Sequence, residues 1–77
     1  MYRYFELLPI KNKKNIVSLG EGWTPLTPTR KVGLEIDLHD LWIKDEGIIP
    51  TASFKARGLG MAISKAKELG ISKVALP

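Results

Sequence analysis

Residues 54–69 carry the pattern that most constrains how this chain can fold. Apolar side chains recur there at three- and four-residue spacing, which predicts an amphipathic helix. These side chains are Leu59, Ala62, Ile63, Ala66 and Leu69. Ser53 or Thr51 can cap the start of the helix, and Gly70 follows its last apolar residue as a stop signal.

Lys55 falls on the apolar side of this predicted helix. At roughly 100° per residue it lies within about 40° of most of the apolar residues, whereas Lys65 and Lys67 lie well away from them. We therefore expect Lys55 to point along the buried stripe. Burial and the positive end of the helix dipole both disfavour an ammonium ion, and the neutral amine is the form that attacks an aldehyde. The alternative is a snorkelling lysine with a packed stem and an amine in water.

The composition excludes several classes of site. There is no cysteine, so disulfides and thiolate metal sites are absent, which suits the cytoplasm. His39 is the only histidine and is interpreted as a surface residue, so we expect no metal site. No apolar run approaches the ~20 residues that span a bilayer, and the N-terminus lacks a signal-peptide core, so we expect no membrane partner.

The net charge of +4 owes much to Lys11, Lys13 and Lys14 in a polar segment. Such a cluster can bind nucleic acid by electrostatics. No aromatic interleaving or groove-reading motif accompanies it, which favours a solvated basic loop and no nucleic-acid partner.

The first forty residues divide into an arm and an edge segment. Residues 1–15 form the arm and basic loop, in which residues 2–10 are either a short strand or an arm that packs on something else. Residues 16–40 contain a turn at 20–26 and an edge strand or loop at 26–30. Period-two alternation at 31–38 predicts a half-buried strand.

Residues 41–77 read as a β–α–β unit, which places the chain in the α/β class. Residues 41–43 predict a central strand, the helix follows, and residues 73–77 predict a second strand, parallel to the first with a right-handed crossover. Ligands collect at the carboxyl ends of such strands, so Lys44, Asp45 and Glu46 lie near a site or form a solvated strand end.

The same region carries a family resemblance. Glu46 followed by Thr51-Ala52-Ser53-Phe54-Lys55-Ala56-Arg57-Gly58-Leu59 resembles the cofactor-attachment signature of pyridoxal-phosphate enzymes of fold type II, the tryptophan-synthase-β-like family. Gly20-Glu21-Gly22-Trp23-Thr24-Pro25-Leu26 and Leu41-Trp42-Ile43-Lys44-Asp45-Glu46-Gly47 look like the opening of threonine synthases. Many threonine synthases have Gly and Asp where this chain has Ala52 and Ala56, and family members usually carry a short helix where the alternation at 31–38 predicts a strand.

The resemblance implies a chemistry for several residues. Lys55 would hold pyridoxal 5'-phosphate as a Schiff base and later move protons on the substrate, and Phe54 would contact the ring of the cofactor. Ser53 and Arg57 would support this site. The implied reaction converts O-phospho-L-homoserine and water to L-threonine and phosphate, by a carbon–oxygen lyase of threonine biosynthesis that is cytoplasmic and homodimeric.

The resemblance also implies that much of such an enzyme is missing. The loops that hold the substrate carboxylate, the cofactor phosphate and the ring nitrogen are not found in these residues. We therefore expect residues 1–77 to be a single N-terminal fragment of a fold type II enzyme, marginally stable and inactive alone. Two alternatives remain open: a threonine or serine dehydratase of the same fold, and a non-catalytic folding or interaction fragment.

Overall fold

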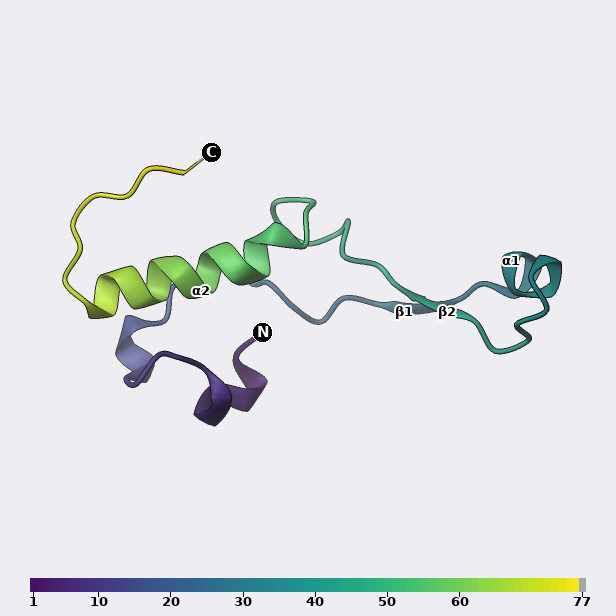
Figure 1. Cartoon of the computed structure of the whole chain (residues 1–77), viewed down its shortest axis with the longest axis horizontal. Coiled ribbons are helices and arrows are strands. Elements are labelled where there is room, and N and C mark those ends of the chain that lie inside the picture. The colour runs from purple at the N-terminus through teal and green to yellow at the C-terminus, as the bar shows by residue number, and fades with distance from the viewer. Residues whose placement is uncertain (77) are drawn as a thin grey trace.

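The computed structural model describes residues 1–76, which are spread out along one direction (Figure 1). The chain measures 51 × 28 × 17 Å along its principal axes and has a radius of gyration of 16.5 Å. A compact domain of this length would have a radius of gyration of about 11.5 Å. The buried apolar side chains are Ile10, Ile49 and Ala56, so the core is small.

The longest element is α2, Lys55–Glu68, which confirms the predicted helix to within one residue at each end. Leu69 closes it, and Gly70 adopts φ +72°, the left-handed conformation that commonly follows a helix. The start is less regular than expected. Phe54 occupies the cap position without a side-chain bond, and the Ser53 hydroxyl accepts only a long hydrogen bond of 3.4 Å from the Lys55 amide.

The N-terminal arm lies along α2 and contains two short 3-10 helices, η1 at Tyr2–Leu7 and η2 at Lys13–Asn15 (Figure 1). Because residues 2–7 are helical, the strand alternative for residues 2–10 is wrong. The Glu68 carboxylate fixes the arm by accepting hydrogen bonds from the backbone amides of Lys11 and Asn12 at 2.8 and 2.9 Å.

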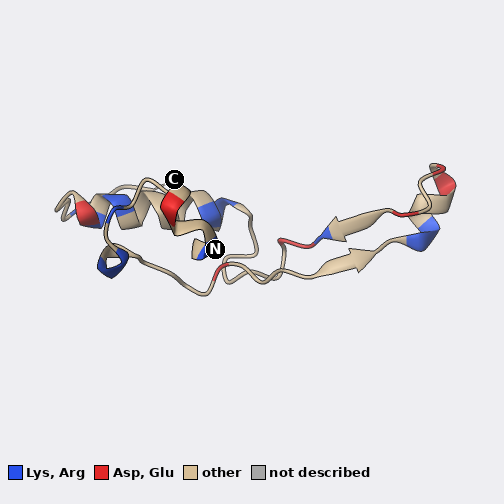
Figure 2. Ribbon diagram, turned by 90° about the horizontal axis from the view of Figure 1, so that it is seen from below, with Lys and Arg blue, Asp and Glu red and all other residues tan. Residues whose placement is uncertain are grey.

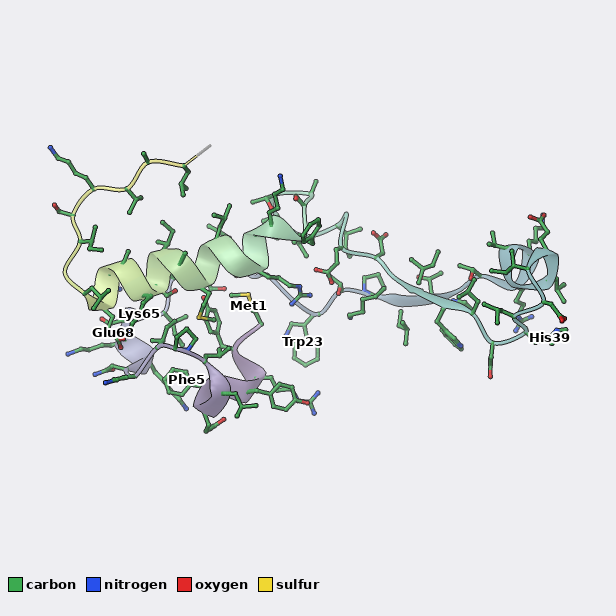
Figure 3. All side chains as sticks on the ribbon, viewed as in Figure 1. Met1, Phe5, Trp23, His39, Lys65 and Glu68 are labelled. Atoms are coloured by element: carbon green, nitrogen blue, oxygen red, sulfur yellow. The ribbon has the colours of Figure 1, made fainter. Side chains whose placement is uncertain are left out.

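Basic residues gather where η2 meets the last turns of α2 (Figure 2). Lys65 donates to Glu68 at 2.6 Å (Figure 3). Lys67 donates to the Lys14 carbonyl at 3.1 Å. Cations are favourable beside the negative end of a helix dipole. The positive charge at this end of the molecule therefore stabilises α2.

A ribbon of two strands projects away from α2 (Figure 1). Strands β1, Leu26–Pro28, and β2, Trp42–Lys44, pair antiparallel with Leu26 opposite Lys44, which confirms the edge strand at 26–30. Their connection contains the helix α1, Arg30–Glu35, so the strand predicted over 31–38 is wrong. No third strand pairs with that segment in the described residues, and a bond of 2.8 Å from the Gly33 amide to the Thr29 carbonyl starts the helix instead.

The predicted parallel β–α–β unit is not formed. The partner of β2 is the preceding strand β1 in an antiparallel pair, and residues 71–76 form no strand; Pro77 lies outside the described residues. A short segment needs a neighbouring strand to satisfy its backbone groups, and none lies beside residues 71–76. Over residues 1–76, no helix is both long and apolar enough to pass through a bilayer.

Candidate functional site

Three separate segments of the chain meet in one hydrogen-bonded cluster, which we call the clamp and define as Thr24, Glu46 and Arg57. The guanidinium of Arg57 binds the Glu46 carboxylate twice, through Nε at 2.5 Å and Nη2 at 2.8 Å. The Thr24 hydroxyl donates to the same carboxylate at 2.7 Å and accepts from Nη2 at 3.3 Å. The clamp therefore joins the turn at 20–26, the end of β2 and the first turn of α2.

The clamp is a charged, two-point contact and is only partly open to solvent. The hydrogen bond from Arg57, followed by that from Thr24, lowers the pKa of Glu46 to about 2. The same pairing raises the pKa of Arg57, against a smaller opposing effect of burial. Lys44 adds a hydrogen bond from its amine to the Thr24 carbonyl. Glu46 is thus an ionised acceptor at neutral pH, held by Arg57 and unsuited to take up a proton.

Lys55 is the first residue of α2, and its side chain is exposed, so the predicted burial is wrong for this chain. Its amine has no hydrogen bond or ion pair among residues 1–76. Positions two apart on a helix lie about 200° apart, so Lys55 and Arg57 project from nearly opposite sides of α2.

The reason for the exposure is that the arm covers a different face of α2. The covered face carries small residues at four-residue spacing, Ala56, Gly60 and Ser64, and its centre lies about 120° around the helix axis from the stripe that begins at Lys55. Ser64 is fully buried and accepts a hydrogen bond from the Val17 amide at 2.8 Å. The large apolar residues predicted to be covered, such as Leu59 and Leu69, remain open to solvent.

Two hollows border Lys55. One, of about 760 Å³, is lined by Lys55, Phe54 and Leu59 together with the clamp residues Glu46 and Arg57. The other, of about 400 Å³, lies on the side toward Val17, Leu19 and Ile63 and includes Lys55 and Leu59 as well. The structure thus brings the two site residues predicted from the sequence, Lys55 and Phe54, to the wall of one hollow.

The loop before α2 is held in an unusual backbone conformation. Ala52 has φ +51°, in the left-handed region that strains every residue with a Cβ atom. The Ala52 amide donates to the Ile49 carbonyl at 2.7 Å, and the Ile49 side chain is buried. This tight turn, anchored by the buried Ile49 side chain, fixes the position at which the chain enters α2 at Lys55.

Glu21 is a residue whose role we did not predict. It is buried, and its carboxylate accepts a hydrogen bond of 2.6 Å from Ser18. Burial raises the pKa of Glu21, but the bonds from Ser18 and from backbone amides outweigh it and leave the pKa lowered. A Cβ atom at Gly60 would approach the Glu21 carboxylate to 3.0 Å, so the glycine allows this close contact.

Other residues singled out in the sequence lie away from Lys55. The Trp23 side chain projects into solvent from the turn that carries Thr24, and His39 lies at the far end of the ribbon (Figure 3). Neither lines the two hollows beside Lys55. The clamp could have been suspected from the sequence, because Glu46 and Arg57 carry opposite charges on either side of the loop.

Comparison with known proteins gives a consistent result. The family model described as pyridoxal-phosphate dependent enzyme matches residues 17–76. Threonine synthase of Methanocaldococcus jannaschii is 43% identical over 74 residues, which cover 96% of this chain and 18% of that protein. Threonine synthases of Halalkalibacterium halodurans and of Bacillus sp. (strain ULM1) are 43% and 46% identical, over 91% and 88% of this chain and 20% and 19% of their own lengths.

The chain therefore spans about a fifth of the length of the curated relatives it matches. No solved structure matches the chain significantly.

Proposed function

The chain belongs to the pyridoxal-phosphate-dependent enzymes, and from that membership we propose that it supplies the cofactor-binding lysine of a threonine synthase. The curated relatives named above are threonine synthases, which supports this subfamily. The observation that carries the proposal is the clamp, because the three motifs of the resemblance meet there beside Lys55. The substrates would be O-phospho-L-homoserine and water, and the products L-threonine and phosphate.

The residues present fit the cofactor. Lys55 offers an unpaired primary amine, among the described residues, at the edge of a hollow whose wall includes the ring of Phe54. An amine that is not held in an ion pair is free to form a covalent bond with an aldehyde. When bound, pyridoxal phosphate supplies an electron sink for carbanions. We propose that Lys55 holds it covalently and that Phe54 contacts a face of its ring.

Lys55 would also carry the proton transfers. With a substrate bound, the amine of Lys55 would act as a general base and then as a general acid, removing a proton from one substrate carbon and returning it to another. This transfer needs the unprotonated amine. Covering the open stripe of α2 in a complete enzyme would exclude water from the site.

The 77 residues alone provide only part of such a site. Among the described residues, neither hollow has a basic residue other than Lys55 and Arg57, and Arg57 is engaged by Glu46. A cofactor phosphate therefore has no dedicated anchor here. We propose that turnover, dimer formation and a cytoplasmic location belong to the complete enzyme, and that the 77-residue chain is inactive.

The experiment that tests the reaction measures products. A complete enzyme that carries these residues should release phosphate from O-phosphohomoserine in step with threonine formation, and Lys55→Ala should abolish this release. Ammonia release from threonine or serine, without phosphate release from phosphohomoserine, would instead identify a dehydratase of the same family.

A further inference from the structure

We propose that the clamp is a positioning device for Lys55, with Arg57 as a positioning residue that orients the first turn of α2 and does not bind the substrate. This inference rests on the proposed role of Lys55 in covalent attachment. Arg57 and Lys55 are two residues apart in the same helical turn, and both line the larger hollow.

The geometry shows what the clamp restrains. Arg57 and Lys55 belong to one helical turn, and their side chains project about 200° apart around its axis. A contact that fixes Arg57 therefore also fixes the direction in which Lys55 projects. A two-point bond between a guanidinium and a carboxylate defines an orientation as well as a distance. A shift of α2 by one residue would rotate its side chains by about 100° and carry Lys55 away from the hollow.

The two partners of Arg57 in the clamp, Glu46 and Thr24, are themselves held in place by the paired strands. Glu46 lies just beyond β2, and Thr24 lies just before β1, and these strands pair with each other. The Asp45 amide donates to the Pro25 carbonyl at 3.1 Å, which extends the ladder to the residues beside the clamp. Arg57 is therefore bound to the paired end of the ribbon rather than to a loose loop.

The bonds of Arg57 argue against direct recognition of a substrate anion. Its Nε and Nη2 atoms are occupied by Glu46 and Thr24, and the carboxylate already balances its charge. Releasing Arg57 to bind a phosphate would leave the Glu46 carboxylate, which is only partly exposed, without its main donor. Arg57 therefore orients α2 through its bonds to Glu46 and Thr24 and does not bind a substrate anion.

The test measures where pyridoxal phosphate reacts on the 77-residue chain. The chain is treated with limiting pyridoxal phosphate, reduced with borohydride and digested, and the share of label on Lys55 is compared with that on the eight other lysines. The variants are Arg57→Gln, Arg57→Lys and the exchanged pair Glu46→Arg with Arg57→Glu. Lys65→Gln is the matched control, because it removes the ion pair at the other end of α2.

In the wild-type chain, we expect Lys55 to carry more of the label than an equal division among the nine lysines would give it. Arg57→Gln should bring that share down to about the one-ninth expected for uniform labelling of nine lysines, since small misplacements of a reacting group have large effects on its reactivity. Arg57→Lys should restore little, because lysine cannot make the two-point bond, whereas the exchanged pair should restore much of the share. Lys65→Gln should leave the Lys55 share unchanged.

Far-ultraviolet circular dichroism on the same samples distinguishes a loss of Lys55 positioning from a loss of the helix α2 itself. If Arg57→Gln unfolds α2, the exchanged pair decides: recovery of both helix and Lys55 labelling supports the clamp, and recovery of the helix alone overturns it. Wild-type selectivity that persists in Arg57→Gln overturns the clamp and leaves the function of Lys55 standing. Uniform labelling of the wild-type lysines overturns the clamp, and the role of Lys55 in a complete enzyme is decided separately by the loss of label and of phosphate release in Lys55→Ala.

Discussion

The guanidinium of Arg57 and the carboxylate of Glu46 are joined by two hydrogen bonds, of 2.5 and 2.8 Å, although ten residues separate them in the sequence. This pair lies in the same hollow wall as Lys55 and takes a third partner, Thr24, from the preceding turn. In a chain with so small a core, a directed polar contact of this kind decides where the start of α2 lies.

The strained backbone at Ala52 predicts a stabilising substitution. Ala52→Gly removes a Cβ atom at φ +51°, where an L-residue costs roughly 1–2 kcal/mol, against a smaller gain in the freedom of the unfolded chain. We expect the free energy of unfolding to rise by up to about 1 kcal/mol in urea titrations. Ala62→Gly, in the exposed middle of α2, is the control and should lower it by about 1 kcal/mol. A loss of stability in both variants would contradict the strain.

The two glycines inside α2 should respond differently to alanine. Gly58→Ala meets no atom within 4 Å and should stabilise α2 by about 0.8–1 kcal/mol through helix propensity. Gly60→Ala places a Cβ atom 3.0 Å from the Glu21 carboxylate and should lose that gain. Thermal unfolding of the two variants measures the difference. Equal stabilisation would mean that the arm does not pack closely on this face of α2.

The buried hydroxyl of Ser64 should contribute to stability. It accepts a hydrogen bond from the Val17 amide and donates one to the Gly60 carbonyl at 2.7 Å. The Tyr2 hydroxyl lies 3.2 Å from it. Ser64→Ala leaves the Val17 amide without that acceptor, at a cost of about 1–3 kcal/mol. Ser72→Ala, at an exposed position, is the control and should have little effect. Chemical denaturation that shows no difference between the two variants would contradict the contact.

Stability should fall with acid through two carboxylates. The hydrogen bond from Arg57 lowers the pKa of Glu46 to about 2, and that from Lys65 lowers the pKa of Glu68 to about 2, from an ordinary value of 4.5. A lowered pKa in the folded state gives stability that is present above pH 4.5 and is lost as the pH falls toward 2.

The measurement is the unfolding midpoint as a function of pH. Glu46→Gln and Glu68→Gln should each flatten its fall between pH 4.5 and 2. Glu35→Gln is the control, because Glu35 is exposed and forms no ion pair among residues 1–76, and it should leave the curve unchanged. Identical curves for all three variants would show that the two carboxylates are not bound as described.

The sequence predicted the elements whose signals are local. The periodicity of residues 55–68 and the glycine after them are properties of one segment, and α2 follows them closely. The predicted parallel strand at residues 73–77 is wrong over residues 73–76, because strand formation depends on which other strands are present to pair with. The strand predicted from the alternation over 31–38 is wrong for the same reason, since no other strand pairs with that segment in the described residues.

The roles of Lys55 and Phe54 stay predictions. The two residues line one hollow, but the burial of Lys55 depends on what covers its face, and the arm covers a different face of α2. The small residues Ala56, Gly60 and Ser64, at four-residue spacing, were the available signal for that close-packed face. Contact among the three motifs through Thr24 is a long-range relationship that no local pattern contains.

The most direct test of the account locates the amine that reacts. A complete enzyme that carries these residues should be reduced with borohydride in the presence of pyridoxal phosphate, and the modified peptide identified by mass. The account predicts that the label lies on Lys55 and that Lys55→Ala loses it together with phosphate release. Label that remains in Lys55→Ala with its absorbance unchanged, or that lies on another lysine in the wild-type enzyme, would contradict it.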